Sequence, residues 1–484
     1  MAGGFRLKKL KRTFLFSAIL SAALVISSVP ISGLAHDDLG SDIIEKGQGA
    51  GYGKNDTLIL EGKFRNLTEV APEMKVIRAD GKQNSFGDVY AHKGFAYIGT
   101  HTNNGGNGGV RVFDLKDPAN PKEVAVFAHN DVPGTWQEKV IVKSVRTPYF
   151  KGDLAVVSVQ QLNRNNPDSQ GGFLLYDVTK PYNPKKLGFW KVTKKTNGTH
   201  ELYLTVQGNR VLVLAANPYA DYYSHGEEKD FQIVDVSNPV NPSTIWQFDP
   251  RTLEEIPDDF NGYHWNAPDG KTRPVFNHST MVDDTGKFAY VSMWDLGTAI
   301  FDIRNPENPI YLGRTQYAPH QQGSAHSAAL AKGGRILIET REVYNPSKAG
   351  YEQAYGYTRI FDIKDKTNPK LLSEFKTELV DDIEDGVTFA NTVHDPKVVG
   401  KILFLSHYAG GVRAVDISNP ANPVEIGKYV PIDSNVWGVF VERNYILASD
   451  IGTGLKVLYK KDAHDDNEDA EEPENDGDND DNEN

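Results

Sequence analysis

Short runs of β-favouring apolar residues recur along the chain, and each ends at an acidic residue followed by a polar turn. One run is GGVRVFDLKDPANP, which ends at Pro121, and another is KDFQIVDVSNPVNP, which ends at Pro242. Val, Ile and Phe favour strands, whereas Asn, Asp and Pro favour turns because they bond to nearby backbone or fix φ. Each unit therefore predicts a strand that stops at a tight turn.

This unit occurs six times in full and once in a degenerate form. The other full copies end at Pro184, Pro309, Pro369 and Pro423, and the seventh copy, TGLKVLYK, has Tyr459 in place of the acidic residue. The six acidic residues lie 54 to 67 residues apart and are Asp114, Asp177, Asp235, Asp302, Asp362 and Asp416. Repeats of this length indicate one closed repeat architecture rather than several unrelated domains.

Each unit also predicts further strands around the acidic turn. Two strand-like segments precede the turn, for example residues 279–282 and 288–292, and one follows it, for example residues 123–127. Four antiparallel strands per unit, repeated seven times, are typical of a β-propeller. We therefore predict an all-β fold, a seven-bladed β-propeller of four-stranded blades, over residues 66–461.

The two ends of this region complement each other. The seventh copy stops before its outer strand, while the N-terminal segment Asn66–Val70 resembles Asn120–Val124, which opens an outer strand in the first blade. An N-terminal strand is thus predicted to complete the last blade and close the ring, which leaves few free strand edges. An open solenoid, the alternative, would not explain the complementary ends.

These repeats resemble the LVIVD-repeat family, whose name describes runs such as Phe231-Gln232-Ile233-Val234-Asp235. The resemblance covers roughly residues 66–460. It implies an extracellular or surface β-propeller and adds little about chemistry, because propellers serve unrelated functions.

The N-terminal segment has the pattern of a signal peptide over residues 1–35. Five basic residues precede an apolar stretch from Phe14 to Val29, and Gly33 and Ala35 supply small residues before a cleavage point at His36. An uncleaved membrane anchor is the alternative. We expect secretion or display at the cell surface, with residues 36–65 as an N-terminal extension and no transmembrane segment in the mature form.

Composition narrows the classes of chemistry. The chain has no cysteine, which excludes disulfides and thiolate catalysis. The formal net charge of the chain is −13. The tail over residues 462–484 has 13 acidic and no basic residues, and residues 1–35 have five basic residues, so residues 36–461 carry a net charge of −5. We expect the tail to be disordered. Such an acidic body does not favour nucleic-acid binding.

Strand order places the long loops on one face of the propeller. The loops between second and third strands, residues 103–108, 161–171, 217–230 and 341–355, and the crossover over residues 249–274 lie there, opposite the uniform acidic turns. Variable loops on a rigid scaffold often bind partners, and aromatic side chains suit that role, although these rings could also only pack their own loops. The candidate residues are Tyr219, Tyr222, Tyr223, Tyr263, Trp265, Tyr344, Tyr351 and Tyr355.

Histidines form a second pattern, on the same face. His278 and His326 each precede by nine residues the basic residue that opens the second strand, so both occupy the start of an innermost strand. The six candidates around one mouth of the channel are His101, His200, His278, His326, His394 and His407. Imidazole commonly binds transition metals, but histidines at these positions could instead be structural. Asp88, Glu138 and Glu201 begin other inner strands and could serve as further ligands or as solvated acids.

Two functions remain open from the sequence. Because the chain lacks a GxSxG elbow, a P-loop and a GxGxxG motif after a strand, we favour a non-enzymatic binding scaffold over an enzyme. Its expected partner is an extracellular protein or cell-wall component, and we expect a monomer. The alternative is a metal-dependent oxidoreductase, distantly similar to the selenium-binding protein and methanethiol oxidase family, with a transition metal ion at the histidine cluster.

Overall fold

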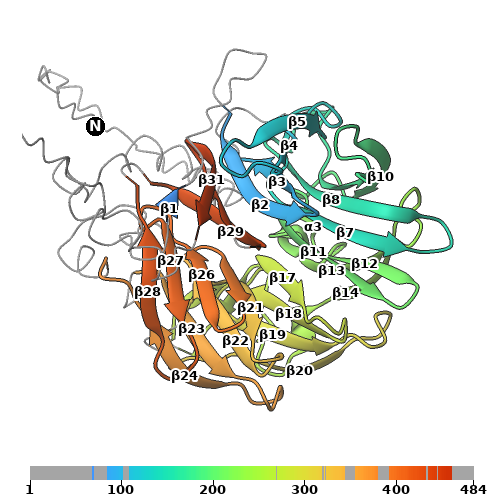
Figure 1. The fold of residues 1–484 in the computed structure, drawn as a ribbon. Coiled ribbons are helices and arrows are strands. Elements are labelled where there is room, and N and C mark those ends of the chain that lie inside the picture. Colours follow the sequence, from blue (N-terminus) through green and yellow to red (C-terminus); the bar gives the residue numbers. More distant parts are fainter. Residues whose placement is uncertain are drawn as a thin grey trace, which may run out of the picture.

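The computed structural model describes residues 68–69, 84–101, 108–268, 270–318, 321, 323–343, 355–379, 392–431, 434–443 and 445–459. Over these residues the chain forms seven blades arranged around a central axis (Figure 1). The predicted seven-bladed β-propeller is thus confirmed. The predicted signal peptide, the N-terminal extension over residues 36–65 and the acidic tail lie outside the described residues.

The first three blades each run from an inner strand to an outer strand. They consist of β2 (Phe86–His92), β3 (Phe95–Thr100), β4 (Val110–Asp114) and β5 (Lys122–Phe127); β7 (Val140–Arg146), β8 (Lys151–Gln161), β9 (Gly172–Asp177) and β10 (Lys185–Lys191); and β11 (Glu201–Gln207), β12 (Arg210–Ala216), β13 (Phe231–Asp235) and β14 (Ser243–Phe248). The short strand β6 (Thr135–Trp136) also pairs with β8.

The next three blades repeat this order. They consist of β17 (Ser279–Val282), β18 (Phe288–Met293), β19 (Gly297–Asp302) and β20 (Ile310–Arg314); β21 (Ala325–Ala331), β22 (Ile336–Arg341), β23 (Tyr357–Asp362) and β24 (Lys370–Phe375); and β25 (Pro396–Val399), β26 (Ile402–Ser406), β27 (Val412–Asp416) and β28 (Val424–Tyr429). The loops add the hairpin of β15 (His264–Asn266) and β16 (Thr272–Pro274), the helix α3 (Ala220–Ser224) and the 3₁₀ turn η3 (Pro250–Thr252).

The last blade joins the two ends of the propeller sequence. It contains β29 (Val436–Glu442), β30 (Tyr445–Asp450) and β31 (Gly454–Tyr459), and its outer strand is β1 (Thr68–Glu69). Thr68 pairs with Tyr459 and Glu69 with Leu458 in antiparallel register. The predicted closure by an N-terminal strand is confirmed.

The acidic turns show why the repeat ends as it does. In all six full copies the aspartate carboxylate accepts a hydrogen bond from the backbone N–H two residues further on, at 2.7 to 3.0 Å. This local bond starts a turn that ends the strand. The seventh copy has Tyr459 at the corresponding position, and its strand β31 pairs with β1.

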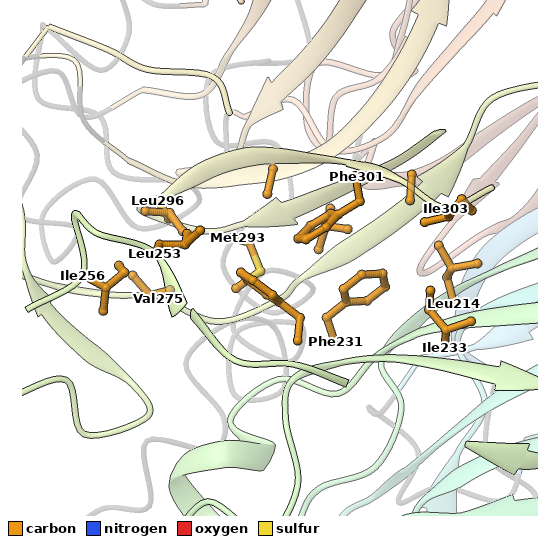
Figure 2. Packing of buried hydrophobic residues seen from close by; sticks show 14 of the residues in the cluster. Leu214, Phe231, Ile233, Leu253, Ile256, Val275, Met293, Leu296, Phe301 and Ile303 are labelled. Atoms are coloured by element: carbon orange, nitrogen blue, oxygen red, sulfur yellow. The ribbon is translucent and has the colours of Figure 1, made fainter. Parts of the chain in front are cut away.

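The core lies between neighbouring blades. Figure 2 shows one such cluster, in which Leu214, Phe231 and Ile233 of the third blade meet Met293, Phe301 and Ile303 of the fourth. These side chains are buried because strands alternate their side chains between the two faces of each blade, and both faces pack against a neighbour. Among the described residues, no helix is long and apolar enough to cross a membrane.

Candidate functional site in the central channel

One aromatic or imidazole ring from each blade closes the loop-face end of the central channel. Four of these rings belong to histidines near the start of an inner strand, and they follow one another with centroids 4.7, 4.1 and 4.3 Å apart. We call the complete set the seven-ring layer; it consists of Trp136, His200, His278, His326, His394, Trp437 and His101.

The two tryptophans complete the circle. Trp437 lies 4.2 Å from His394 and 4.7 Å from His101, and Trp136 lies 5.6 Å from His101 and 6.0 Å from His200, all between ring centroids. Every member of the layer is at most 2% exposed. The layer is therefore a buried circle of rings in tilted and edge-to-face contact, with one ring from each of the seven blades.

The sequence analysis identified the histidines of the layer but not its tryptophans. Trp437 lies eight residues before Tyr445, which opens the second strand of its blade. His278 and His326 lie ten residues before Phe288 and Ile336, which open the second strands of their blades, so the position of Trp437 differs from theirs by two residues. Aligning the blades with that allowance would have found Trp437.

Three carboxylates surround the layer and fix its rings. Glu138 accepts a hydrogen bond from Trp437 Nε1 at 2.7 Å, and its other oxygen lies 3.0 Å from His200 Nδ1. Gln160 Oε1 also lies 2.9 Å from His200 Nδ1. Two acceptor oxygens beside Nδ1 assign the proton of His200 to that nitrogen, so that its Nε2 is the acceptor atom. That Nε2 lies 3.2 Å from His278 Nε2.

The second and third carboxylates are those of Glu342 and Asp395. Glu342 accepts a hydrogen bond from the Tyr408 hydroxyl, and its Oε2 lies 3.7 Å from His326 Nε2. Asp395 Oδ1 accepts from Ser327 Oγ at 2.7 Å and lies 3.8 Å from Nδ1 of both His326 and His394. Glu342 and Asp395 thus face the two different ring nitrogens of His326.

Burial controls the charge of these groups. It lowers the pKa of His278, His326 and His394 well below the ordinary value, and neighbouring imidazoles add to this effect. Burial likewise raises the pKa of Glu342 well above its ordinary value. Desolvation disfavours charge in a medium of low dielectric constant, so these three imidazoles are neutral at neutral pH.

His407, the sixth candidate histidine, lies away from this layer. Its ring lies close to Gly410, and burial together with the nearby Arg413 lowers its pKa to about 3. The structure therefore brings together five of the six candidate histidines. His407 belongs instead to the packing of the Gly410 turn.

The candidate aromatic residues of the loop face are mostly buried. Tyr219 and Tyr263 pack with Phe276 and Trp294, and Trp265 lies in the core between the third and fourth blades. Tyr355 is also buried, whereas Tyr223 is half-buried and Tyr222 is 36% exposed. Tyr344 and Tyr351 lie outside the described residues.

On the other side of the layer, the channel widens into a cavity of about 580 Å³. It is lined by inner strands and by the turns at residues 283–285 and 332–334, so it opens on the face of the acidic turns. At its inner end the ammonium of Lys139 lies 2.6 Å from Asp88, 3.0 Å from Glu201 and 3.2 Å from Asp395. Asp88 and Glu201, predicted to begin inner strands, are thus partners of one lysine.

The four charges of this cluster depend on one another. Burial raises the pKa of Asp88 to about 6, against the opposing effect of Lys139, and it raises the pKa of Glu201 well above its ordinary value. Burial disfavours the charged lysine, but the three carboxylates outweigh it and raise the pKa of Lys139 well above its ordinary value. The cluster therefore keeps a charged lysine among acids that hold excess negative charge.

Comparison with known proteins supports the repeat assignment. Residues 226–249, 281–316 and 393–430 match the model of the LVIVD repeat. The chain carries LVIVD repeats. Each matched LVIVD segment contains one of the acidic turns, and the third also contains His394 of the seven-ring layer. No curated protein matches the chain.

Solved structures resemble this LVIVD-repeat chain in fold alone. A candidate 6-phosphogluconolactonase from Bacteroides uniformis is 12% identical, with a TM-score of 0.51 over 76% of this chain and 92% of that one. The β-propeller domain of Cps50 (Swd1) from Myceliophteria thermophila is also 12% identical, with a TM-score of 0.49 over 80% and 99%. At 12% identity the likeness to the candidate 6-phosphogluconolactonase indicates a propeller fold and no shared activity.

Proposed function

We propose that the protein is an exported binding scaffold that contacts an extracellular protein or cell-wall component through its loop face. The observation that carries the proposal is a contact between the long loops of two adjacent blades. The guanidinium of Arg164 lies 3.4 Å from the centroid of the Tyr223 ring, and Tyr222, 5.4 Å from Tyr223, is exposed. We call Arg164, Tyr222 and Tyr223 the loop-face patch.

The composition of the loop-face patch suits recognition. Tyrosine offers a rigid ring and a hydroxyl, and arginine stacked on an aromatic ring keeps free donors for a partner. The scaffold beneath the patch is closed through all seven blades, so the two loops are held in fixed relative positions. Export is supported by the signal-peptide pattern of the first 35 residues.

The test compares two faces of the same protein. Mature protein is incubated with purified cell-wall polymers and with the secreted protein fraction, and bound material is quantified for wild type, Tyr222→Ala with Arg164→Ala, and the control Tyr149→Ala. Tyr149 is 68% exposed and lies in the turn between β7 and β8, on the opposite face. We expect at least a tenfold loss only in the double variant. Full binding by that variant would show that the loop-face patch is not the contact surface.

A metal-dependent oxidoreductase is the second candidate, and the seven-ring layer is the observation that favours it. Two sets of buried histidine and carboxylate groups lie close enough to share an ion. Oxygen uptake by copper-loaded protein in the presence of a small thiol is the measurement. Uptake above that of the metal-free protein is expected if the protein is such an enzyme, and equal rates would reject this candidate.

A further inference from the structure

We infer that the seven-ring layer contains a binding site for one transition metal ion of the zinc or copper class, with His278, His326 and Glu342 as ligands. Their donor atoms all lie within 4.8 Å of one another, and all three residues are buried. Two imidazoles and one carboxylate form a donor set that these ions prefer, whereas Mg²⁺ and Ca²⁺ prefer oxygen ligands. This inference does not depend on partner binding at the loop face.

The spacing of the donors suits a tetrahedral ion. Metal–ligand bonds of about 2.0–2.2 Å place two ligand atoms of a tetrahedron roughly 3.3 Å apart. The distance from His326 Nε2 to Glu342 Oε2 is 3.7 Å, so a small rotation of the carboxylate brings both atoms to coordinating distance. His278 lies beside His326, with ring centroids 4.1 Å apart.

Tyr408 orients the carboxylate ligand. Its hydroxyl donates to Glu342 Oε1, which directs Oε2 toward His326. The Tyr408 ring itself packs against His394 and Trp437, at 5.4 and 5.5 Å between centroids. Outer partners that hold a ligand in place are typical of metal sites, and their loss weakens binding by about 10–100-fold. Tyr408 is therefore a positioning residue of the proposed site.

A second donor set, His326, His394 and Asp395, shares His326 with the first. Asp395 differs from Glu342 because Lys139 lies 3.2 Å from its Oδ2 and Ser327 donates to its Oδ1. A fixed ammonium so close to the carboxylate repels a metal cation. The set with Glu342 is therefore the favoured one, and the shared imidazole predicts one ion per chain.

The experiment uses untagged, full-length mature protein stripped with a chelator and then titrated separately with Zn²⁺, Cu²⁺ and Co²⁺. Co²⁺ is included because its visible absorption reports tetrahedral coordination by nitrogen and oxygen. Bound metal is measured by elemental analysis, and circular dichroism checks the fold of each variant. The variants are Glu342→Gln, His278→Gln, Tyr408→Phe and Asp395→Asn, with His225→Gln as the control because His225 is exposed and outside the layer.

We expect about one ion per chain in wild type, the ordinary occupancy of a single site. Folded Glu342→Gln and His278→Gln should bind at least about 100-fold more weakly, and Tyr408→Phe about 10–100-fold more weakly. Asp395→Asn and His225→Gln should keep the ion.

Less than about 0.2 ion per chain in wild type would overturn the inference. Loss of the ion in Asp395→Asn with retention in Glu342→Gln would equally overturn it, because the second donor set would then be the site. Partner binding assayed on metal-free protein tests the loop-face proposal separately.

Discussion

The central channel has two halves, the seven-ring layer and the cavity that ends at the Lys139 cluster. Adjacent residues at the starts of the same inner strands supply these two halves, although the chemistry of the halves differs. His200, His326 and His394 belong to the buried seven-ring layer, whereas the residues that follow them, Glu201, Ser327 and Asp395, belong to the charged end of the cavity. Neighbouring residues in an extended chain point in different directions, so one short segment can supply both halves.

This difference shows how seven similar blades can build an asymmetric channel. The layer is made of rings whose contacts pass from each blade to the next. The cavity end is held by one cation: Lys139, of the second blade, meets acids of the first, third and sixth blades. Stability should therefore depend on charge compensation in the cavity and on packing in the layer, and substitutions can separate the two effects.

The largest effect is expected for Lys139→Met. Removing the lysine leaves three buried carboxylates without their cation, which typically costs about 3–5 kcal/mol when a buried pair is broken. Protonation of these acids relieves the cost, and Asp88 without Lys139 takes up its proton at a higher pH than in wild type, where its pKa is about 6. The loss should therefore be greatest at high pH and should shrink as the pH falls toward about 6. Urea unfolding of wild type and variant at pH 8 and pH 5 provides the measurement.

The double variant Lys139→Met with Asp88→Asn sharpens this result. It removes one of the excess negative charges and should recover part of the lost stability at pH 8. An equal loss at both pH values, with no recovery in the double variant, would mean that Lys139 acts through packing rather than charge.

A smaller loss is expected in the layer, for Trp437→Phe. The substitution keeps an aromatic ring beside His394 but removes the Nε1–H that donates to the buried Glu138 at 2.7 Å. An unsatisfied buried acceptor costs about 1–3 kcal/mol. Adding Glu138→Gln should restore part of the difference. Unfolding curves that match wild type would show that the layer does not depend on this bond.

Most of the fold was accessible from sequence because the repeat is a local signal. The turn aspartates mark strand ends through a bond that spans two residues, and the N-terminal segment carries the same pattern as the outer strands. The placement of the long loops and the acidic turns on opposite faces also followed from the sequence, because successive antiparallel strands run in alternating directions. Repetition made each local prediction reinforce the others.

The layer could be predicted only in part. The shared position of His278 and His326 was visible from their spacing. His407 follows a second strand, as His101 does, but unlike His101 it lies outside the layer. Trp136 could not be found from the repeat, because it lies in the extra strand β6, four residues before the inner strand β7 begins at Val140. Burial of Tyr219 and Trp265 depends on how long loops fold over the blades, which no periodic pattern encodes.

Both halves of the channel require a closed ring, and deletion of residues 1–77 tests that closure. The deletion removes β1, whose two residues pair with Leu458 and Tyr459. With about 0.5–1.5 kcal/mol for each lost backbone hydrogen bond, the loss should be on the order of 1–3 kcal/mol, and the exposed edge of β31 should promote aggregation. Melting curves against the chain that begins at His36 provide the measurement.

Deletion of residues 462–484 is the control and should leave the melting temperature nearly unchanged. Equal stability of the N-terminal deletion and the longer chain would contradict the closed ring.

The smallest effect is expected for Glu378→Gln, at a residue that belongs neither to the seven-ring layer nor to the lining of the cavity. Burial raises the pKa of Glu378, but Arg413, 2.9 Å away, and Lys428 outweigh it and lower the pKa to about 2. A carboxyl group with a lowered pKa in the folded state stabilises the protein above its ordinary pKa of 4.5, and this contribution is lost as the pH falls toward about 2. Because the Glu378 side chain is 43% exposed, the difference between wild type and variant should stay below about 1 kcal/mol at pH 7 and vanish near pH 2.

The control for this last variant is Glu227→Gln. Glu227 pairs with Lys195 at 3.4 Å, and both side chains are more than half exposed, so its loss should be undetectable by urea unfolding. A loss for Glu378→Gln that persists undiminished at pH 2 would show that the glutamate stabilises the sixth blade by packing and not by its charge. A loss at pH 7 as large as that of Lys139→Met would go further. It would mean that charge compensation matters as much at the rim of the blades as at the channel axis, and the contrast between the two halves of the channel would then not explain where the protein is sensitive to charge.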